Sequence, residues 1–290
     1  MTELLLSKDP QRFITQPLLV EANAEQLLYQ PLAQSLSFGQ MQARRVPLQL
    51  SCAEQFTTEV ANLGVSVRLT LRWQGQDYAI VVQQERPDRG DCVLKLISGY
   101  VPSHLLELPL LCALEEVAEE CLIETPHGFL PGRFDCVWLP TPYADHLPHH
   151  KKASYQLQAK CGSARTVRNQ RQTLQERPSA YVHTPTASLQ LVYDLQLQLP
   201  DNLGPISLWH VDEHLEGQHL VARLDRRHPK LFLAPLTEHG MANQLFSLHN
   251  GELIAADTRD IWLSEGFAPR QHWLVQDSHI HWADYHARAH

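Results

Sequence analysis

The sequence predicts an α+β fold whose sheet is mixed or antiparallel. Two observations carry this prediction: stretches with apolar residues at every second position recur along the chain, and a single strong helix pattern lies among them. The chain has 290 residues, of which 43% are hydrophobic and 19% charged, so it can bury a substantial core. That length suits one large domain or two modest ones.

The first part of the chain, residues 1–48, is predicted to form an N-terminal arm that is partly helical. Leu27, Leu28 and Leu32 fall near helical spacing, and Pro31 interrupts the pattern. We expect residues 49–290 to form one domain with an insertion at about 145–180.

The clearest strand signal begins at residue 65. Apolar and polar side chains alternate from Val65 to Trp73, which is typical of a half-buried strand. Gly75 then marks a turn, and 78–82 is predicted to be the partner strand of a hairpin. A polar loop over 85–91 and a short strand over 93–97 complete this part.

A helix is expected at about 109–123. Pro109 suits its first turn, where a missing N–H costs nothing. The residues on one face are apolar, and they are Leu110, Leu114, Val117 and Cys121. The opposite arc is acidic, and it holds Glu115, Glu116, Glu119 and Glu120.

The second half of the chain returns to strands after an irregular stretch. Residues 124–144 contain four prolines and are expected to be irregular. Residues 145–180 hold seven Lys or Arg against two Asp or Glu, a net charge of +5, which predicts a basic insertion or mobile loop. The later expected strands are 189–199, 219–224, 230–234, 244–249, 252–256 and 272–282. Asn250-Gly251 between two of them is a strong hairpin signal.

Composition and missing motifs exclude several classes of protein. The net charge of −8 and the pI of about 6.1 make nucleic acid an unlikely partner. No run of about 18 apolar residues is present, so no membrane partner is expected. The absence of a secretory signal and the scattered cysteines predict a cytoplasmic protein. GxSxG, P-loop and GxGxxG motifs are all missing from the sequence.

The acidic helix is the most informative feature for function. Its four glutamates cover an arc of roughly 140°, and like charges four residues apart destabilise a helix. No Lys or Arg occurs between Lys95 and Arg133 to offset this repulsion. Hard carboxylate oxygens on one face suit Mg²⁺ or Mn²⁺. The alternative is a solvated acidic face on an ordinary amphipathic helix.

This arrangement resembles the Nudix box, in which a glutamate is followed after seven residues by an arginine and a cluster of glutamates. The residues that agree with the pattern are Glu107, Glu116, Val117, Glu119, Glu120 and Ile123. The departures are Glu115 at the arginine position, Leu122 at a glycine position, and a leading Gly99 that lies two residues too far from Glu107. Including the preceding strands, the resemblance extends over roughly 65–125, and more weakly to about 265.

The resemblance implies a Nudix-like mixed sheet with the box helix at about 109–123, and metal-dependent hydrolysis of a nucleoside diphosphate linked to another moiety. The implied catalytic residues are Glu107, Glu116 and Glu120, and the implied metal ligands are Glu116, Glu119 and Glu120. Weaker candidates for contacting substrate phosphate are Arg86, Lys95 and Arg133. The implied cofactor is Mg²⁺ or Mn²⁺, the implied partner is a nucleotide-type small molecule, and proteins of this family are often homodimers.

The missing arginine leaves the activity open. In the family this arginine orients a catalytic glutamate, and Glu115 removes that ion pair and adds another acid. A distant cation such as Arg133 could substitute in space. If none does, the expected function is a catalytically inactive Nudix-fold module that binds a ligand or regulates a partner.

Histidines offer a third reading, a zinc-dependent hydrolase. The two clusters are His146, His149 and His150, and the pair His279 and His281. Neither cluster has a zinc-motif spacing, so ordinary hydrogen bonds are the expected role. The polar run 209–214 could supply a ligand or a base, although we expect it to be a turn or the start of a helix.

Overall fold

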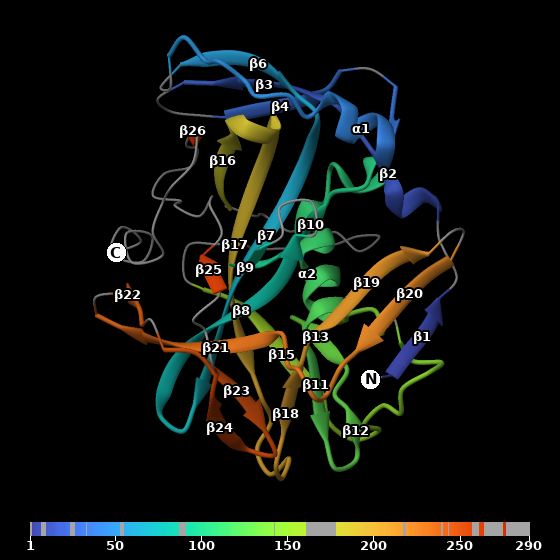
Figure 1. Ribbon diagram of the computed structural model, residues 1–290, viewed down its shortest axis with the longest axis vertical. Coiled ribbons are helices and arrows are strands. Elements are labelled where there is room, and N and C mark those ends of the chain that lie inside the picture. Colours follow the sequence, from blue (N-terminus) through green and yellow to red (C-terminus); the bar gives the residue numbers. More distant parts are fainter. Residues whose placement is uncertain are drawn as a thin grey trace.

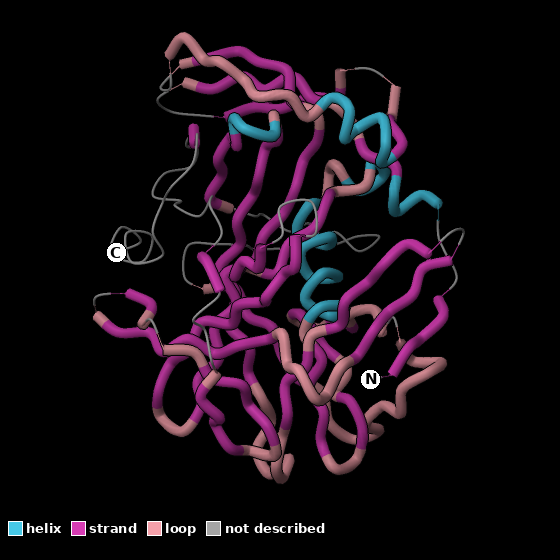
Figure 2. The backbone as a smooth tube through the Cα atoms, in the orientation of Figure 1, coloured by secondary structure: helices cyan, strands magenta, loops and turns pink. Residues whose placement is uncertain are grey.

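Strands dominate the computed structural model (Figure 2). Its described part contains two α-helices, α1 (Phe38–Arg44) and α2 (Pro109–Glu120). The described residues are 2–6, 10–23, 27–32, 34–52, 55–86, 91–141, 143–160, 178–216, 219–238, 240–242, 244–256, 261–263 and 275–276. None of the helices among these residues is long and apolar enough to cross a membrane.

The centre of the fold is a mixed sheet built on three long strands, β7 (Asn62–Trp73), β8 (Gln76–Arg86) and β17 (Ser188–Gln198). β7 and β8 form the expected antiparallel hairpin, and Gln74 and Gly75 both take positive φ in its turn. β7 and β17 are parallel over ten paired positions, from Asn62 beside Ser188 to Leu71 beside Leu197. The expectation of a mixed sheet is therefore confirmed.

Further strands extend this sheet on both sides. Its main path runs β14-β13-β15-β17-β7-β8-β21-β23-β24. The strands not yet defined on this path are β13 (Gly132–Phe134), β14 (Val137–Trp138), β15 (Tyr155–Ala159), β21 (Leu231–Thr237), β23 (Phe246–His249) and β24 (Glu252–Ala255). The hairpin expected at Asn250-Gly251 forms between β23 and β24, with positive φ at both turn residues.

Several short strands pair beside the main path. They are β9 (Asp91–Lys95), β10 (Ile97–Tyr100), β16 (Ser179–His183), β22 (Gly240–Met241), β25 (Ile261–Leu263) and β26 (Val275–Gln276). The strand expected over 272–282 is described only at β26, and its other residues lie outside the described part of the chain.

Smaller sheets surround the central one. Two of them have three strands each and adjoin the end of α2: β1 (Thr2–Leu6) with β20 (His219–Leu224) and β19 (Val211–Glu216), and β12 (Gly128–Phe129) with β11 (Leu122–Thr125) and β18 (Ser207–Trp209). β4 (Leu27–Pro31), β3 (Leu18–Ala22) and β6 (Phe56–Val60) form a third, and β2 (Ile14–Thr15) pairs with β5 (Leu36–Ser37). Short 3-10 helices are η1 (Pro10–Phe13), η2 (Ser103–Leu105) and η3 (Thr184–Thr186).

The N-terminal residues differ from the expected pattern. Leu27 and Leu28 lie in strand β4, not in a helix, and the described helices before residue 48 are the short α1 and the single 3-10 turn η1. Strand pairing with β3 overrides the weak helical spacing here, since β3 buries Leu18 and Val20 completely. These residues join the same apolar core as the central sheet.

The basic stretch at 145–180 also differs in part from the insertion or mobile loop that was expected there. Residues 155–159 within the expected insertion form β15, which lies between β13 and β17 in the central sheet. Tyr155 and Leu157 are buried, whereas Gln158 is exposed. Buried and more exposed side chains therefore alternate along 155–159 as in an ordinary strand, although the surrounding residues are basic. The expectation that 145–180 is an insertion outside the core is wrong for residues 155–159. Residues 161–177 lie outside the described part of the chain.

Helix α2 packs across the sheet and positions the acidic residues. Its apolar face contacts β10 and β7, and Leu110, Leu114 and Val117 are all buried there, as expected (Figure 1). The helix ends at Glu120 instead of continuing to about 123. Cys121 leaves the helical region at φ −120°, and Leu122 and Ile123 pair with β18 as part of β11.

Candidate functional site

The glutamates of α2 do not form a freely solvated face. Glu119 is only 7% exposed, and Glu115, Glu116 and Glu120 are half-buried. The sheet β1-β20-β19 lies beside the C-terminal half of α2, and β10 lies under it (Figure 1). The carboxylates therefore occupy a partly enclosed region between elements from three distant parts of the chain.

The cation closest to this region comes from the N-terminal segment. Arg12, in η1, forms an ion pair with the Glu119 carboxylate, although the two residues are 107 positions apart. Glu213 of β19 adds a fifth carboxylate nearby, and Tyr143 donates a hydrogen bond to it with 2.9 Å between the two oxygens. The Tyr143 hydroxyl also lies 3.3 Å from the Glu119 backbone carbonyl oxygen, so it holds β19 close to the helix.

Glu116 lies over a glycine on the neighbouring strand. A Cβ atom on Gly99 of β10 would stand 1.8 Å from Glu116 Oε1, so only glycine leaves room for this carboxylate. Among the described residues, Glu116 has no hydrogen bond or ion pair. The leading glycine thus borders the acidic helix despite its shifted spacing.

Glu120 has one occupied and one open oxygen. Lys95 Nζ, at the end of β9, lies 3.3 Å from Glu120 Oε1 and also 3.3 Å from Ser98 Oγ. Glu120 Oε2 is buried and has no hydrogen-bond partner among the residues that the structure describes. An unpaired buried carboxylate oxygen is costly, so this atom is a position where a cation would stabilise the site.

The charges of this region do not balance. The described residues here supply five carboxylates, those of Glu115, Glu116, Glu119, Glu120 and Glu213, against the cations Arg12 and Lys95, so full ionisation leaves a net charge of −3. Burial and the charges of Glu120 and Glu119 raise the pKa of Glu116 well above its ordinary value. Burial also raises the pKa of Glu115, and it raises the pKa of Glu119 to about 7 although Arg12 opposes the shift. Excess negative charge favours either protons or a cation here.

The donor types in this region fit a magnesium-like ion. Within the described residues, no three His, Cys, Asp or Glu side chains already form a metal-holding group. Mg²⁺ needs fewer protein ligands than that, because it commonly keeps several waters and is held by one or two carboxylates together with substrate phosphates. Glu116 and the open oxygen of Glu120 could provide those two carboxylates.

The other expected site residues do not join this group. Glu107 is exposed and precedes α2, and the seven residue steps from Pro109 to Glu116 add about 10 Å of helix rise. Arg133, proposed as a substitute cation, stacks on Trp138 at 4.6 Å in β13 and β14. The side chain of Arg86 lies outside the described part, so of the three phosphate candidates the structure brings only Lys95 to α2.

Sequence reasoning missed Arg12 and Tyr143 as members of this region, and it named Glu213 only as part of a polar run that could supply a ligand or a base. Arg12 and Tyr143 carry no local signal, since only tertiary contacts bring them to α2. Glu213 falls in the polar run 209–214, which was expected to be a turn or a helix start. That expectation is wrong, because the run spans β18 and β19. His210 in this run lies 3.1 Å from the Glu120 backbone carbonyl oxygen through Nδ1.

The histidine clusters make ordinary contacts where they are described. His150 Nδ1 accepts a hydrogen bond from the Ala153 backbone N–H at 2.8 Å, and His149 Nδ1 lies 2.9 Å from the Leu147 carbonyl oxygen. His279 and His281 lie outside the described residues.

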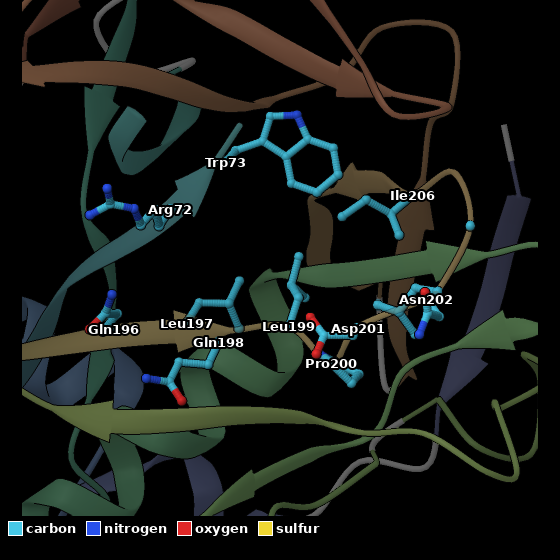
Figure 3. Close-up of a pocket in the computed structure, with 12 residues that line it drawn as sticks. Arg72, Trp73, Gln196, Leu197, Gln198, Leu199, Pro200, Asp201, Asn202 and Ile206 are labelled. Atoms are coloured by element: carbon cyan, nitrogen blue, oxygen red, sulfur yellow. The ribbon is translucent and has the colours of Figure 1, made fainter. Parts of the chain in front are cut away.

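Two cavities lie away from the acidic helix. One, of about 640 Å³, lies where the β7–β8 hairpin meets the loop after β17, and Trp73 faces Leu197 and Leu199 across it (Figure 3). The other, of about 470 Å³, is lined by Trp209, Phe232 and the Arg226–His228 turn. Neither cavity includes a glutamate of α2 in its lining.

The chain matches no protein-family model and, at a significant level, no curated protein.

Proposed function

We propose that this protein is a Mg²⁺- or Mn²⁺-dependent hydrolase of a nucleoside diphosphate linked to another moiety, built on a Nudix-like fold. The observation that carries the proposal is the unbalanced charge on α2. In the described part of the chain Glu116 has no hydrogen bond or ion pair and Glu120 Oε2 is buried without a hydrogen bond, in a region with three more carboxylates than cations. A divalent cation relieves both features.

The arrangement of elements supports the fold part of the proposal. A hairpin of long strands, a short strand that contains Gly99, and a helix with glutamates in its C-terminal half follow one another along the chain. The helix then packs across a mixed sheet. This is the order of elements that the resemblance to the Nudix box implies.

In this proposal Glu116 and Glu120 hold the metal ion. The bound ion would neutralise charge on the substrate phosphates and lower the pKa of a coordinated water. Lys95, which pairs with Glu120, would contact a phosphate oxygen of the substrate, since a lysine is a compact charge on a flexible stem. Burial and the charges of Glu120 and Glu119 raise the pKa of Glu116 in the metal-free chain, and a bound cation would oppose that shift by favouring the ionised carboxylate.

A non-catalytic binding or regulatory module is the second candidate. Glu115 replaces the arginine of the box, and Arg12 and Lys95 already pair with two of the glutamates. An internal cation that satisfies a carboxylate reduces the need for a metal ion. This candidate predicts ligand binding without turnover.

Hydrolysis of a panel of nucleoside diphosphates linked to a sugar or to a second nucleotide, with Mg²⁺ or Mn²⁺ present, tests the proposal. We expect Glu116→Gln and Glu120→Gln each to lower turnover by about 100-fold or more. The matched control is Glu252→Gln on the exposed end of β24, which should retain the wild-type rate. Wild-type turnover in both helix variants would refute the proposed site, and binding of a panel compound without turnover would favour the module.

A further inference from the structure

The N-terminal segment contacts the acidic helix through two connected elements. Strand β1 pairs antiparallel with β20 from Thr2 to Leu6, and β20 pairs with β19, which contacts α2. Helix η1 follows β1 in the sequence and brings Arg12 to Glu119. Residues from the beginning of the chain therefore form part of the wall beside α2 (Figure 1).

The two ion pairs on α2 differ in how firmly they hold their carboxylates. Arg12 carries a permanent charge on a planar group, and its partner Glu119 has a side chain only 9% exposed. Breaking a pair at such a buried position leaves an uncompensated charge, which is strongly unfavourable. Lys95 presents a flexible point charge at 3.3 Å from Glu120, and the second oxygen of Glu120 has no hydrogen-bond partner in the described part of the chain.

We propose that Arg12 and Glu119 form a clamp that attaches the N-terminal segment to α2. Glu119 is then a positioning residue and not a metal ligand, which leaves Glu116 and Glu120 to hold the cation. This division of roles rests on the proposed function. The resemblance to the Nudix box implied the opposite for Glu119.

The neighbours of Glu119 fit this role. Arg12 also lies near the charges of Glu213 and Glu116, so one guanidinium faces carboxylates from both β19 and α2. The Tyr143 hydroxyl contacts both Glu213 and the Glu119 backbone carbonyl oxygen near the end of the helix. The clamp therefore connects the N-terminal segment, β19 and α2 at a single point.

Hydrogen exchange of the full-length chain without metal, at about pH 8 where Glu119 is ionised, tests the clamp. Arg12→Gln and Glu119→Gln should each accelerate exchange of the β1 amides by about tenfold, because either change breaks the same pair. The double variant should exchange no faster than the single variants, and Arg12→Lys should be intermediate because it keeps the charge. Arg44→Gln is the matched control, since Arg44 pairs with Glu59 at 3.7 Å on the exposed surface. Unchanged exchange in both single variants, or additive acceleration in the double variant, would overturn the clamp.

Calorimetry with Mn²⁺ tests whether Glu119 is a positioning residue and not a metal ligand. We expect Glu119→Gln to bind Mn²⁺ within about threefold of wild type, whereas Glu116→Gln and Glu120→Gln lose binding. Loss of binding in Glu119→Gln as complete as in Glu120→Gln would overturn the assignment while the proposed function stands. No Mn²⁺ binding by the wild type would refute the proposed function and the assignment of Glu116 and Glu120 as metal ligands. The hydrogen-exchange result would still show whether Arg12 and Glu119 form the clamp.

Discussion

Glu119 and Glu120 are neighbours in the sequence, yet their surroundings differ. Glu119 is paired with Arg12 at a buried position, whereas Glu120 shares Lys95 with Ser98 and keeps one oxygen unpaired. Both are glutamates on the same acidic arc of α2, so the sequence by itself provides no reason to assign them different roles. The difference comes from Arg12, which only the folded chain brings into contact.

The raised pKa of Glu119 has a consequence for stability. Burial raises this pKa to about 7, with Arg12 opposing, from an ordinary value of 4.5. The folded chain thus binds this proton more tightly than the unfolded chain does, so the free energy of unfolding falls as the pH rises from about 4.5 to 7. Glu119→Gln cannot ionise, and we expect a flatter pH dependence for it than for wild type in metal-free urea unfolding. A slope identical to wild type would contradict the raised pKa.

Gly99 provides a second test at the residue scale. An alanine Cβ there would stand 1.8 Å from Glu116 Oε1, so the Glu116 carboxylate must move in Gly99→Ala. Because the displaced atom is the end of a flexible side chain, we expect a modest loss of stability but a clear loss of Mn²⁺ affinity. Gly39→Ala is the matched control, since a Cβ at Gly39 meets no atom within 4 Å. Equal Mn²⁺ affinity in both variants would show that Glu116 does not hold the ion.

At the scale of elements, the sequence predicted strands and helices best where a single local pattern is strong. The strands around 65–73 and 189–199 and the hairpin at Asn250-Gly251 were predicted because their alternation or turn chemistry is strong. Helix α2 was also predicted, although pairing of β11 with β18 ends it earlier than expected. Strand β4 was missed because its leucines fall near helical spacing, although its partner β3 lies just before it in the sequence. Strand β15 was missed because its partner β17 is distant in the sequence.

Strand β15 gives a direct test of one missed element. Leu157 is fully buried between β13 and β17, so Leu157→Ala should lower the free energy of unfolding by about 2–5 kcal/mol. Gln158→Ala, on the exposed side of the same strand, should change it by less than about 0.5 kcal/mol. Urea unfolding measures both, and a similar small effect for the two variants would mean that β15 is not part of the core.

At the scale of the whole molecule, the acidic region depends on long-range assembly. The parallel pairing of β7 with β17 joins segments more than a hundred residues apart, and β1 pairs with β20 near the other end of the described chain. These pairings place Arg12, Lys95 and Glu213 around α2. The sequence predicted the helix that carries the glutamates and named Lys95 as a candidate, but it did not predict Arg12 or the pairing of Lys95 with Glu120, because no local pattern encodes such contacts.

The central claim is that Glu116 and Glu120 on α2 bind a divalent cation. Calorimetric titration of Mn²⁺ into the wild type and into the Glu116→Gln/Glu120→Gln variant tests it most directly. We predict saturable binding by the wild type and none by the double variant, which should be folded and at least as stable without metal because like-charge repulsion is relieved. Equal binding by the two proteins, or no binding by the wild type at millimolar Mn²⁺ with or without a diphosphate compound, would contradict the claim.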